Sequence, residues 1–155
     1  MKKNRIVNVY APVKGVTSDL KDLNDPIFSQ QLMGTGVSIV PQEAIITAPV
    51  AGELLVIMPT NHAFGMKTSE GITLLVHIST TNSEKKIPLH DLQRLTEPGQ
   101  IIDKGTKILA INESTHPLES LSLQIVVTAG AEKGLMTLTV GEEVNKDDII
   151  IEIKS

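Results

Sequence analysis

Short apolar stretches rich in valine, isoleucine and threonine follow one another along most of the chain. Glycine or proline interrupts them about every eight to twelve residues, the turn spacing of a β-sandwich or barrel. The stretches that predict strands are Ile6–Tyr10, Gly36–Val40, Ala44–Thr47, Glu53–Ile57, Ala63–Lys67, Ile72–Ile78, Lys107–Ile111, Leu121–Val127 and Ile149–Ile153. We therefore predict an all-β fold, an antiparallel β-sandwich or barrel-sandwich hybrid.

Helical patterns are scarce. The best helical candidate is Leu89–Leu95, while Pro26–Gln31 and Thr115–Ser120 each suit one turn, so we expect only a few short helical turns. The 155 residues match the usual size of one compact domain. No stretch has the composition of an interdomain linker, and residues 1–155 are expected to form a single domain.

Two short patterns each occur twice. Residues 11–15 read Ala-Pro-Val-Lys-Gly and residues 48–52 read Ala-Pro-Val-Ala-Gly. Residues 99–105 read Gly-Gln-Ile-Ile-Asp-Lys-Gly, and residues 141–147 read Gly-Glu-Glu-Val-Asn-Lys-Asp. Such recurrence predicts an internally repeated β substructure, and the glycine and lysine turns favour a structural role for it.

Composition narrows the function classes. The net charge is -4 and aromatic residues make up 2% of the chain, so the sequence lacks material for a basic phosphate track or a base-stacking platform, and no nucleic acid partner is expected. The absence of cysteine suits a reducing compartment, and we expect a cytoplasmic protein. Ile6–Val13 is short and contains Asn8 and Pro12, so we expect neither a signal peptide nor direct membrane insertion.

The candidate chemistry centres on His62 and His77. The segment between them reads as an antiparallel hairpin with a turn at Thr68-Ser69-Glu70-Gly71. If the loop is even in length and centred between Ser69 and Glu70, the two histidines face each other directly. Opposed β positions hold their Cβ atoms about 4.5–5.5 Å apart, which suits a small shared group such as a phosphoryl.

The same register predicts the surroundings of the pair. It places Phe64 opposite Leu75 and Met66 opposite Thr73 on the histidine face, and puts Ile72, Leu74 and Val76 on the core side. The histidine face then becomes a partly apolar surface with a polar centre, which suits protein docking. The candidate partner-binding residues are Phe64, Met66, Leu75 and Ile78.

A histidine pair supports phosphoryl transfer because neutral imidazole is a nucleophile near pH 7. The second histidine and a hydroxyl such as that of Thr60 can donate to the phosphoryl oxygens. A zinc site is the chemical rival, although two histidines make only half of a tetrahedral site. The chain lacks a Walker loop and a dinucleotide fingerprint, and we expect no cofactor and no metal. His90 and His116 are expected to be exposed structural histidines.

Several blocks of the sequence, in order, carry a resemblance to a known family. Thr60-Asn61-His62-Ala63-Phe64, followed by Leu75-Val76-His77, resembles the active-site signature of the glucose-type enzyme IIA (EIIA) domains of the bacterial sugar phosphotransferase system. Further similar blocks are Tyr10-Ala11-Pro12, Asp25-Pro26-Ile27-Phe28, Met33–Ile39, Ala48–Gly52, Glu97–Gln100 and Val140-Gly141-Glu142. The resemblance covers nearly the whole chain and implies a β-sandwich.

The resemblance implies a phosphotransferase component that acts through a phosphohistidine. His77 would accept a phosphoryl group from phospho-HPr and pass it to a cysteine of a IIB domain for sugar uptake. His62 would donate a hydrogen bond to the phosphoryl group, and the Thr60 hydroxyl would orient the pair. Family members usually continue after this histidine with a glycine and an aspartate, whereas this chain reads Ile78-Ser79-Thr80-Thr81. The alternative reading is therefore a regulatory EIIA-like interaction module with regulatory protein targets and weak or no phosphotransfer.

Overall fold

Eight strands form one large antiparallel sheet. The computed structural model describes residues 5–23, 26–30, 33–81, 91–132 and 134–154. The strands of the large sheet, in their order of pairing, are β13 (Glu143–Val144), β2 (Gly15–Asp19), β3 (Thr35–Pro41), β11 (Leu121–Ala129), β7 (Thr73–Thr80), β6 (Ala63–Lys67), β5 (Gly52–Ile57) and β9 (Gln100–Ile102). Among the described strands, β13 and β9 are the two edges, so this sheet is not closed into a barrel.

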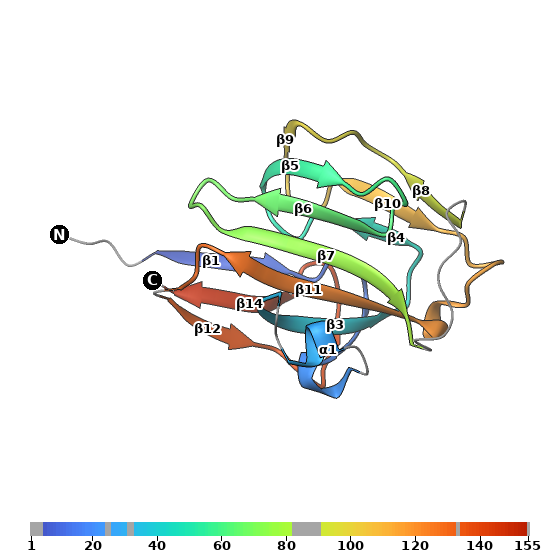
Figure 1. The fold of residues 1–155 in the computed structure, drawn as a ribbon, viewed down its shortest axis with the longest axis horizontal. Helices are drawn as coiled ribbons and strands as arrows, with labels where there is room; N and C mark the ends of the chain where they lie inside the picture. The colour runs from blue at the N-terminus through green and yellow to red at the C-terminus, as the bar shows by residue number, and fades with distance from the viewer. Residues whose placement is uncertain (1–4, 24–25, 31–32, 82–90, 133, 155) are drawn as a thin grey trace.

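Two small antiparallel sheets lie behind the large one (Figure 1). The first contains β1 (Ile6–Tyr10), β14 (Ile149–Lys154) and β12 (Leu135–Leu138). The second contains β4 (Ile45–Thr47), β10 (Lys107–Ile111) and β8 (Leu92–Arg94). The short helical elements are η1 (Leu20–Asp22), α1 (Pro26–Ser29) and η3 (Leu118–Ser120).

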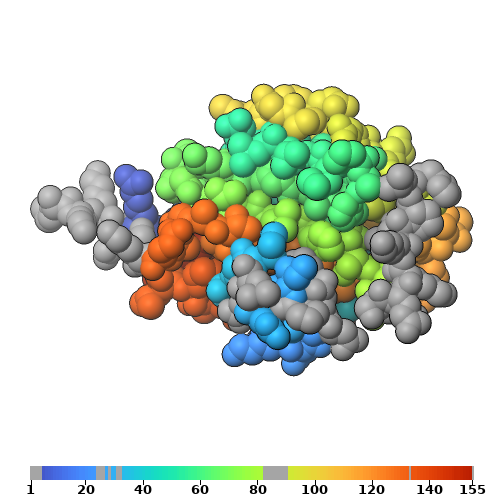
Figure 2. All heavy atoms as spheres, in the orientation of Figure 1, coloured from blue at the N-terminus to red at the C-terminus, as the bar shows by residue number. Residues whose placement is uncertain are grey.

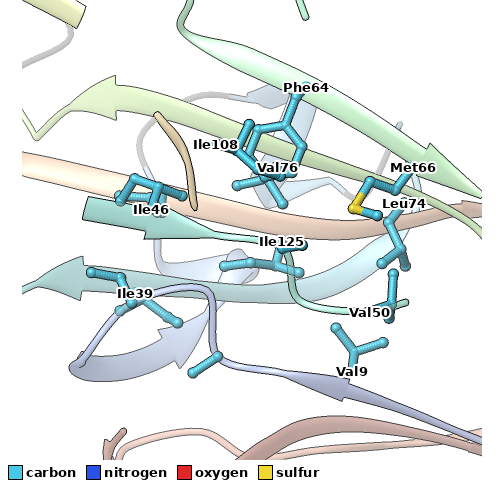
Figure 3. Close-up of a cluster of buried hydrophobic side chains, with 14 of the residues drawn as sticks. Val9, Ile39, Ile46, Val50, Phe64, Met66, Leu74, Val76, Ile108 and Ile125 are labelled. Carbon is cyan, nitrogen blue, oxygen red and sulfur yellow. The ribbon is translucent and has the colours of Figure 1, made fainter. Parts of the chain in front are cut away.

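The core lies between the large sheet and the two small sheets. Its buried side chains come from both layers, as Figure 3 shows for Val9, Ile39, Ile46, Val50, Phe64, Met66, Leu74, Val76, Ile108 and Ile125. Alternate residues of the long strands β7 and β11 enter this core, because successive side chains of a strand point to opposite faces. The predicted all-β sandwich is thereby confirmed.

The sequence repeats pair around each other. Tyr10 N donates to Pro49 O at 2.9 Å, and the equivalent Thr47 N donates to Pro12 O at 2.8 Å. The strands next to the repeats also pair in the same way. The strand β13 pairs with β2, and its counterpart β9 pairs with β5. Likewise β14 pairs with β1 and β10 pairs with β4. The predicted repeated β substructure is therefore present as two matching sets of four strands.

Every predicted strand has an observed counterpart, and the predicted single turns at Pro26 and Thr115 correspond to α1 and η3. The helix predicted at Leu89–Leu95 is wrong, because Leu92–Arg94 is strand β8, although residues 89 and 90 lie outside the described residues. Residues 92–94 are a strand because they pair with β10, which is distant in the sequence, and the local residue pattern carries no sign of that pairing. None of the helices in the described ranges is long and apolar enough to span a bilayer.

Candidate functional site

The β6–β7 hairpin has a register one residue away from the predicted one. Ala63, not His62, lies opposite His77, and Lys67 lies opposite Thr73. The cause is an odd loop, in which Thr68 N donates to Ile72 O at 2.9 Å and three residues lie between these two. Gly71 closes the loop with φ of 90°, as expected for a three-residue hairpin loop whose last residue is left-handed.

This register moves several predicted contact residues into the core. A shift of one residue exchanges the two faces of a strand. Phe64 now faces Val76 and is 0% exposed, and Met66 faces Leu74 and is 1% exposed. Ile78 is 2% exposed for a different reason: it follows His77 on β7 and therefore points to the core face together with Leu74 and Val76, whatever the register. The prediction that these three side chains form a docking surface is therefore wrong, whereas Leu75 is half-buried on the outer face of the sheet.

The two histidine rings nevertheless meet. Their centroids lie 5.2 Å apart with an interplanar angle of 84°, an edge-to-face contact. His77 points outward from the middle of β7, while His62 immediately precedes β6. Strict alternation from Ala63 would send the His62 side chain to the core side. The ring contact therefore depends on the turn before His62 rather than on direct cross-strand pairing.

Asn61 shapes that turn. It has a φ of 59°, the left-handed conformation that asparagine tolerates better than most residues. Its Nδ2 donates to Leu92 O at 3.0 Å, and its Oδ1 accepts from Arg94 Nε at 3.2 Å. Both partners belong to β8, so this short strand, wrongly predicted as helix, fixes the backbone from which His62 projects.

On its other side, His77 contacts a buried polar group. Gln124 lies directly opposite His77 on β11, is 1% exposed, and has Oε1 at 2.8 Å from His77 Nδ1. The Gln124 amide nitrogen donates to Ser79 Oγ at 3.1 Å and to Ser122 Oγ at 2.9 Å. His77 thus belongs to a hydrogen-bonded network that crosses from β7 to β11.

Sequence reasoning missed Gln124, although a signal exists. In Leu121-Ser122-Leu123-Gln124-Ile125, polar residues alternate with apolar ones, and the polar residues share a face. A glutamine within an otherwise buried strand needs hydrogen-bond partners. Only the pairing of β11 with β7 reveals that one of those partners is His77.

Within the described part of the chain, the hydroxyls of Thr60 and Thr81 do not hydrogen-bond to the histidines. The Thr60 hydroxyl oxygen is buried and makes no hydrogen bond within the described part of the chain. Thr81, at the position where the resemblance leads us to expect aspartate, directs both its main-chain N and its Oγ1 to Ser120 O, at 2.8 and 3.2 Å. It therefore brings no carboxylate to the pair.

The electrostatics of the pair favour a neutral His62. Its pKa is lowered from the ordinary histidine value, mainly because burial disfavours the charged ring and secondly because a charge on His77 repels it. Across the described ranges, no group of three or more histidine, aspartate or glutamate side chains is placed to hold a metal ion.

His116 belongs to a separate polar pair. His116 Nε2 lies 3.0 Å from Oδ2 of the buried Asp91, and only 13% of the His116 side chain is exposed. The expectation that His116 is an exposed residue is therefore wrong, because this pair lies partly within the protein. His90 lies outside the described residues.

Comparison with known proteins places the chain and its fold in a family. The model of the family described as phosphoenolpyruvate-dependent sugar phosphotransferase system, EIIA 1, matches residues 7–134. The chain is similar to a glucose-specific EIIA component of Haemophilus influenzae, with 31% identity over 96% of this chain and 89% of the relative. A second such component, from Halalkalibacterium halodurans, is 47% identical over 45% of this chain, and the matched part spans 40% of that relative.

A solved structure and a longer relative agree with this family. The glucose permease IIA from Mycoplasma capricolum superposes with a TM-score of 0.79 and 27% identity, covering 97% of this chain and 96% of that chain. A glucose-specific EIICBA component of Staphylococcus saprophyticus is 29% identical over 95% of this chain, and the matched part is 22% of its length. The resemblance inferred from the histidine blocks is thus confirmed, and the chain belongs to the EIIA 1 family of the phosphoenolpyruvate-dependent sugar phosphotransferase system.

Proposed function

We propose that this domain is a phosphocarrier that accepts a phosphoryl group on His77 from phospho-HPr and passes it to a cysteine of a IIB domain for sugar uptake. The observation that carries the proposal is the edge-to-face contact between His62 and His77 on the outer face of the sheet. A phosphoryl group on one ring would lie within reach of a donor on the other. A cytoplasmic location fits such protein partners.

The two transfers balance without any cofactor. In the first, a ring nitrogen of His77 attacks phosphorus, the new N–P bond forms, and the bond to the donor breaks with its electron pair on the leaving group. In the second, the sulfur of the acceptor, having lost its proton, forms an S–P bond while the N–P bond to His77 breaks. His62 would take up a proton and donate to the phosphoryl oxygens, because the added negative charge opposes the effects that keep this ring neutral.

The surface beside the pair suits protein docking. Val56 and Met58 are 44% and 39% exposed, and Val56 lies opposite Gly65 in the β5–β6 ladder. Gly65 in turn lies opposite the half-buried Leu75. In Figure 2, the green residues of β5, β6 and β7 form the surface above the blue segment that contains α1. Apolar contacts around a polar centre are the usual composition of a transient interface.

Intact-mass measurement tests the first transfer. The protein is incubated with phosphoenolpyruvate, enzyme I and HPr and analysed under non-acidic conditions, which preserve phosphohistidine. We expect the mass of one phosphoryl group to be added to the natural chain and to His116→Gln, but not to His77→Ala. His62→Gln should still be modified on His77, at a lower rate. Absence of added mass with competent donors, or an equal gain in His77→Ala, would contradict the proposal.

The second candidate function is a regulatory EIIA-like module, and the position of Thr81 favours it. Thr81 is hydrogen-bonded to Ser120 and carries no carboxylate, so the described residues 78–81 supply no anion to the histidines. The test is discharge of the phosphorylated domain by IIB domains. If phosphoprotein forms but no IIB domain removes the phosphoryl group, and a non-transport protein binds only one phosphorylation state, the regulatory function is the correct one.

A further inference from the structure

Gln124 stands out because a full amide is buried on the reactive face of the sheet. It is 1% exposed, yet it belongs to the outward-facing residues of β11, beside the half-buried His77. A buried amide without partners is costly, so its orientation is set by the groups around it. Those groups are the imidazole of His77 and the hydroxyls of Ser79 and Ser122.

Ser122 contacts the nitrogen of the amide and His77 contacts its oxygen, whereas Ser79 lies beside both ends. Ser79 Oγ is 3.3 Å from Gln124 Oε1, a longer contact than the 2.8 Å between Oε1 and His77 Nδ1. The two N–H donors have two hydroxyl oxygens to receive them, at 3.1 Å and 2.9 Å. Ser79 Oγ also lies 3.4 Å from Ser122 O, a main-chain acceptor for its own proton. This arrangement leaves the amide oxygen facing His77 Nδ1 at 2.8 Å. A carbonyl oxygen only accepts, so the proton of that hydrogen bond belongs to the ring nitrogen.

We propose that Gln124 is a positioning residue for His77: it accepts from Nδ1–H, holds the neutral ring in that tautomer and directs the lone pair of Nε2 toward the incoming phosphoryl group. The effect on phosphorylation rests on the proposed function, whereas the effect on the tautomer of His77 rests on the hydrogen bond to Gln124 alone. Ser122 and Ser79 act one step further away, by holding the amide in the required orientation. The second ring nitrogen of a reacting histidine commonly sets the tautomer in this way.

This arrangement determines which nitrogen of His77 attacks the phosphoryl group. Nucleophilic attack by Nε2 needs no prior loss of a proton, because in this tautomer the proton resides on Nδ1. The reverse step returns the electron pair to the same nitrogen. Rotation of the ring about the Cβ–Cγ bond would break the hydrogen bond to Gln124, so the bond also holds the ring plane against His62.

The direct test is nitrogen-15 NMR of the unphosphorylated protein at a pH where His77 is neutral. We expect the natural chain to show the Nδ1–H form of His77. Gln124→Met, which keeps the length of the side chain and removes the acceptor, should shift His77 toward the Nε2–H form and slow phosphorylation by roughly 3- to 10-fold, the range expected for one hydrogen bond. Gln124→Glu keeps an acceptor oxygen and should retain the Nδ1–H form.

Two further variants keep the test independent of folding. Ser122→Ala loosens the amide and should give a smaller shift in the same direction. Ser38→Ala is the matched control, because Ser38 is buried opposite Gln124 on β3 and bonds to Ser18 rather than to His77. It should leave the tautomer unchanged.

The outcomes separate the two proposals. A tautomer that depends on Gln124 in a protein that HPr never phosphorylates would support the positioning role and overturn the proposed function. Normal phosphorylation with an Nε2–H ring in the natural chain, or an unchanged tautomer in Gln124→Met, would overturn the positioning role alone.

Discussion

The two histidines of the site are held by different kinds of structure. His77 lies in the middle of a regular strand, paired with Ala63 on one side and Gln124 on the other. His62 lies on a turn that Asn61 closes in a left-handed conformation. The position of His77 therefore follows from sheet register, whereas the position of His62 follows from a local backbone feature anchored to β8. Damage to either structure should affect the pair in a different way.

The largest effect should come from the register that holds His77. Phe64→Ala removes a fully buried ring from the core and should lower the free energy of unfolding by about 3–5 kcal/mol. Leu75→Ala, on the half-buried outer face, should cost less than about 1.5 kcal/mol, since much of its side chain stays near water. Urea denaturation of both variants measures the difference. Equal losses, or a larger loss for Leu75→Ala, would contradict the observed register.

The turn that holds His62 should be the next most sensitive feature. Asn61→Ala places a less tolerant residue at φ 59° and removes both side-chain hydrogen bonds to β8, at a cost of about 2 kcal/mol. The loss should also displace the His62 ring, which nuclear Overhauser contacts between the two rings would report. His77 should remain paired with Gln124.

Asn61→Gly is the matched control, because glycine accepts the left-handed backbone but makes no side-chain hydrogen bond. It should be more stable than Asn61→Ala and yet lose the same contacts with Leu92 and Arg94. If the two variants were equally stable, backbone conformation would contribute nothing at this position.

The same contrast explains which features the sequence could predict. The strands β1, β6 and β10 are predicted with the observed bounds, because each is a run of five mainly apolar residues. The strands β2, β8, β9, β12 and β13 were missed. They are short or polar segments that depend on pairing with a distant strand.

At the site, sequence established the pair but not its surroundings. His62 and His77 are neighbours, as predicted. One additional loop residue at the hairpin tip, however, places Phe64 and Met66 on the core face of β6 instead of the predicted outer face. Loop length is decided by the conformation of Gly71, which the sequence allows in several turn types. Gln124 could not be assigned to His77 because strand order is a tertiary property.

The hairpin tip itself gives the third prediction. Gly71→Ala should cost about 1 kcal/mol through backbone strain alone, since φ is 90° and no atom lies within 4 Å of an added Cβ. Gly71→Asn should be milder, because asparagine tolerates this region better. Thermal unfolding of both variants measures the effect. A neutral Gly71→Ala would indicate that the three-residue loop does not set the register that brings Ala63 opposite His77.

The smallest effect is the pH dependence that arises from His62. Its folded pKa lies below the ordinary value of 6.5, so between these two values the unfolded chain binds more protons than the folded one. Stability should therefore fall as pH decreases below about 6.5, and the fall should end once the folded pKa is passed. Urea denaturation across this range should show a flatter profile for His62→Gln than for the natural chain.

A second variant separates the two causes of the lowered pKa of His62. Burial is the larger cause and the charge of His77 the smaller one, so His77→Gln should retain most of the His62 contribution to the profile. Direct titration of His62 by NMR in this variant provides the same comparison without reference to unfolding. A pKa of His62 that returned fully to its ordinary value in His77→Gln would show that the turn at Asn61 does not bury the ring, and that the neutral state of His62 depends on the strand that holds its partner.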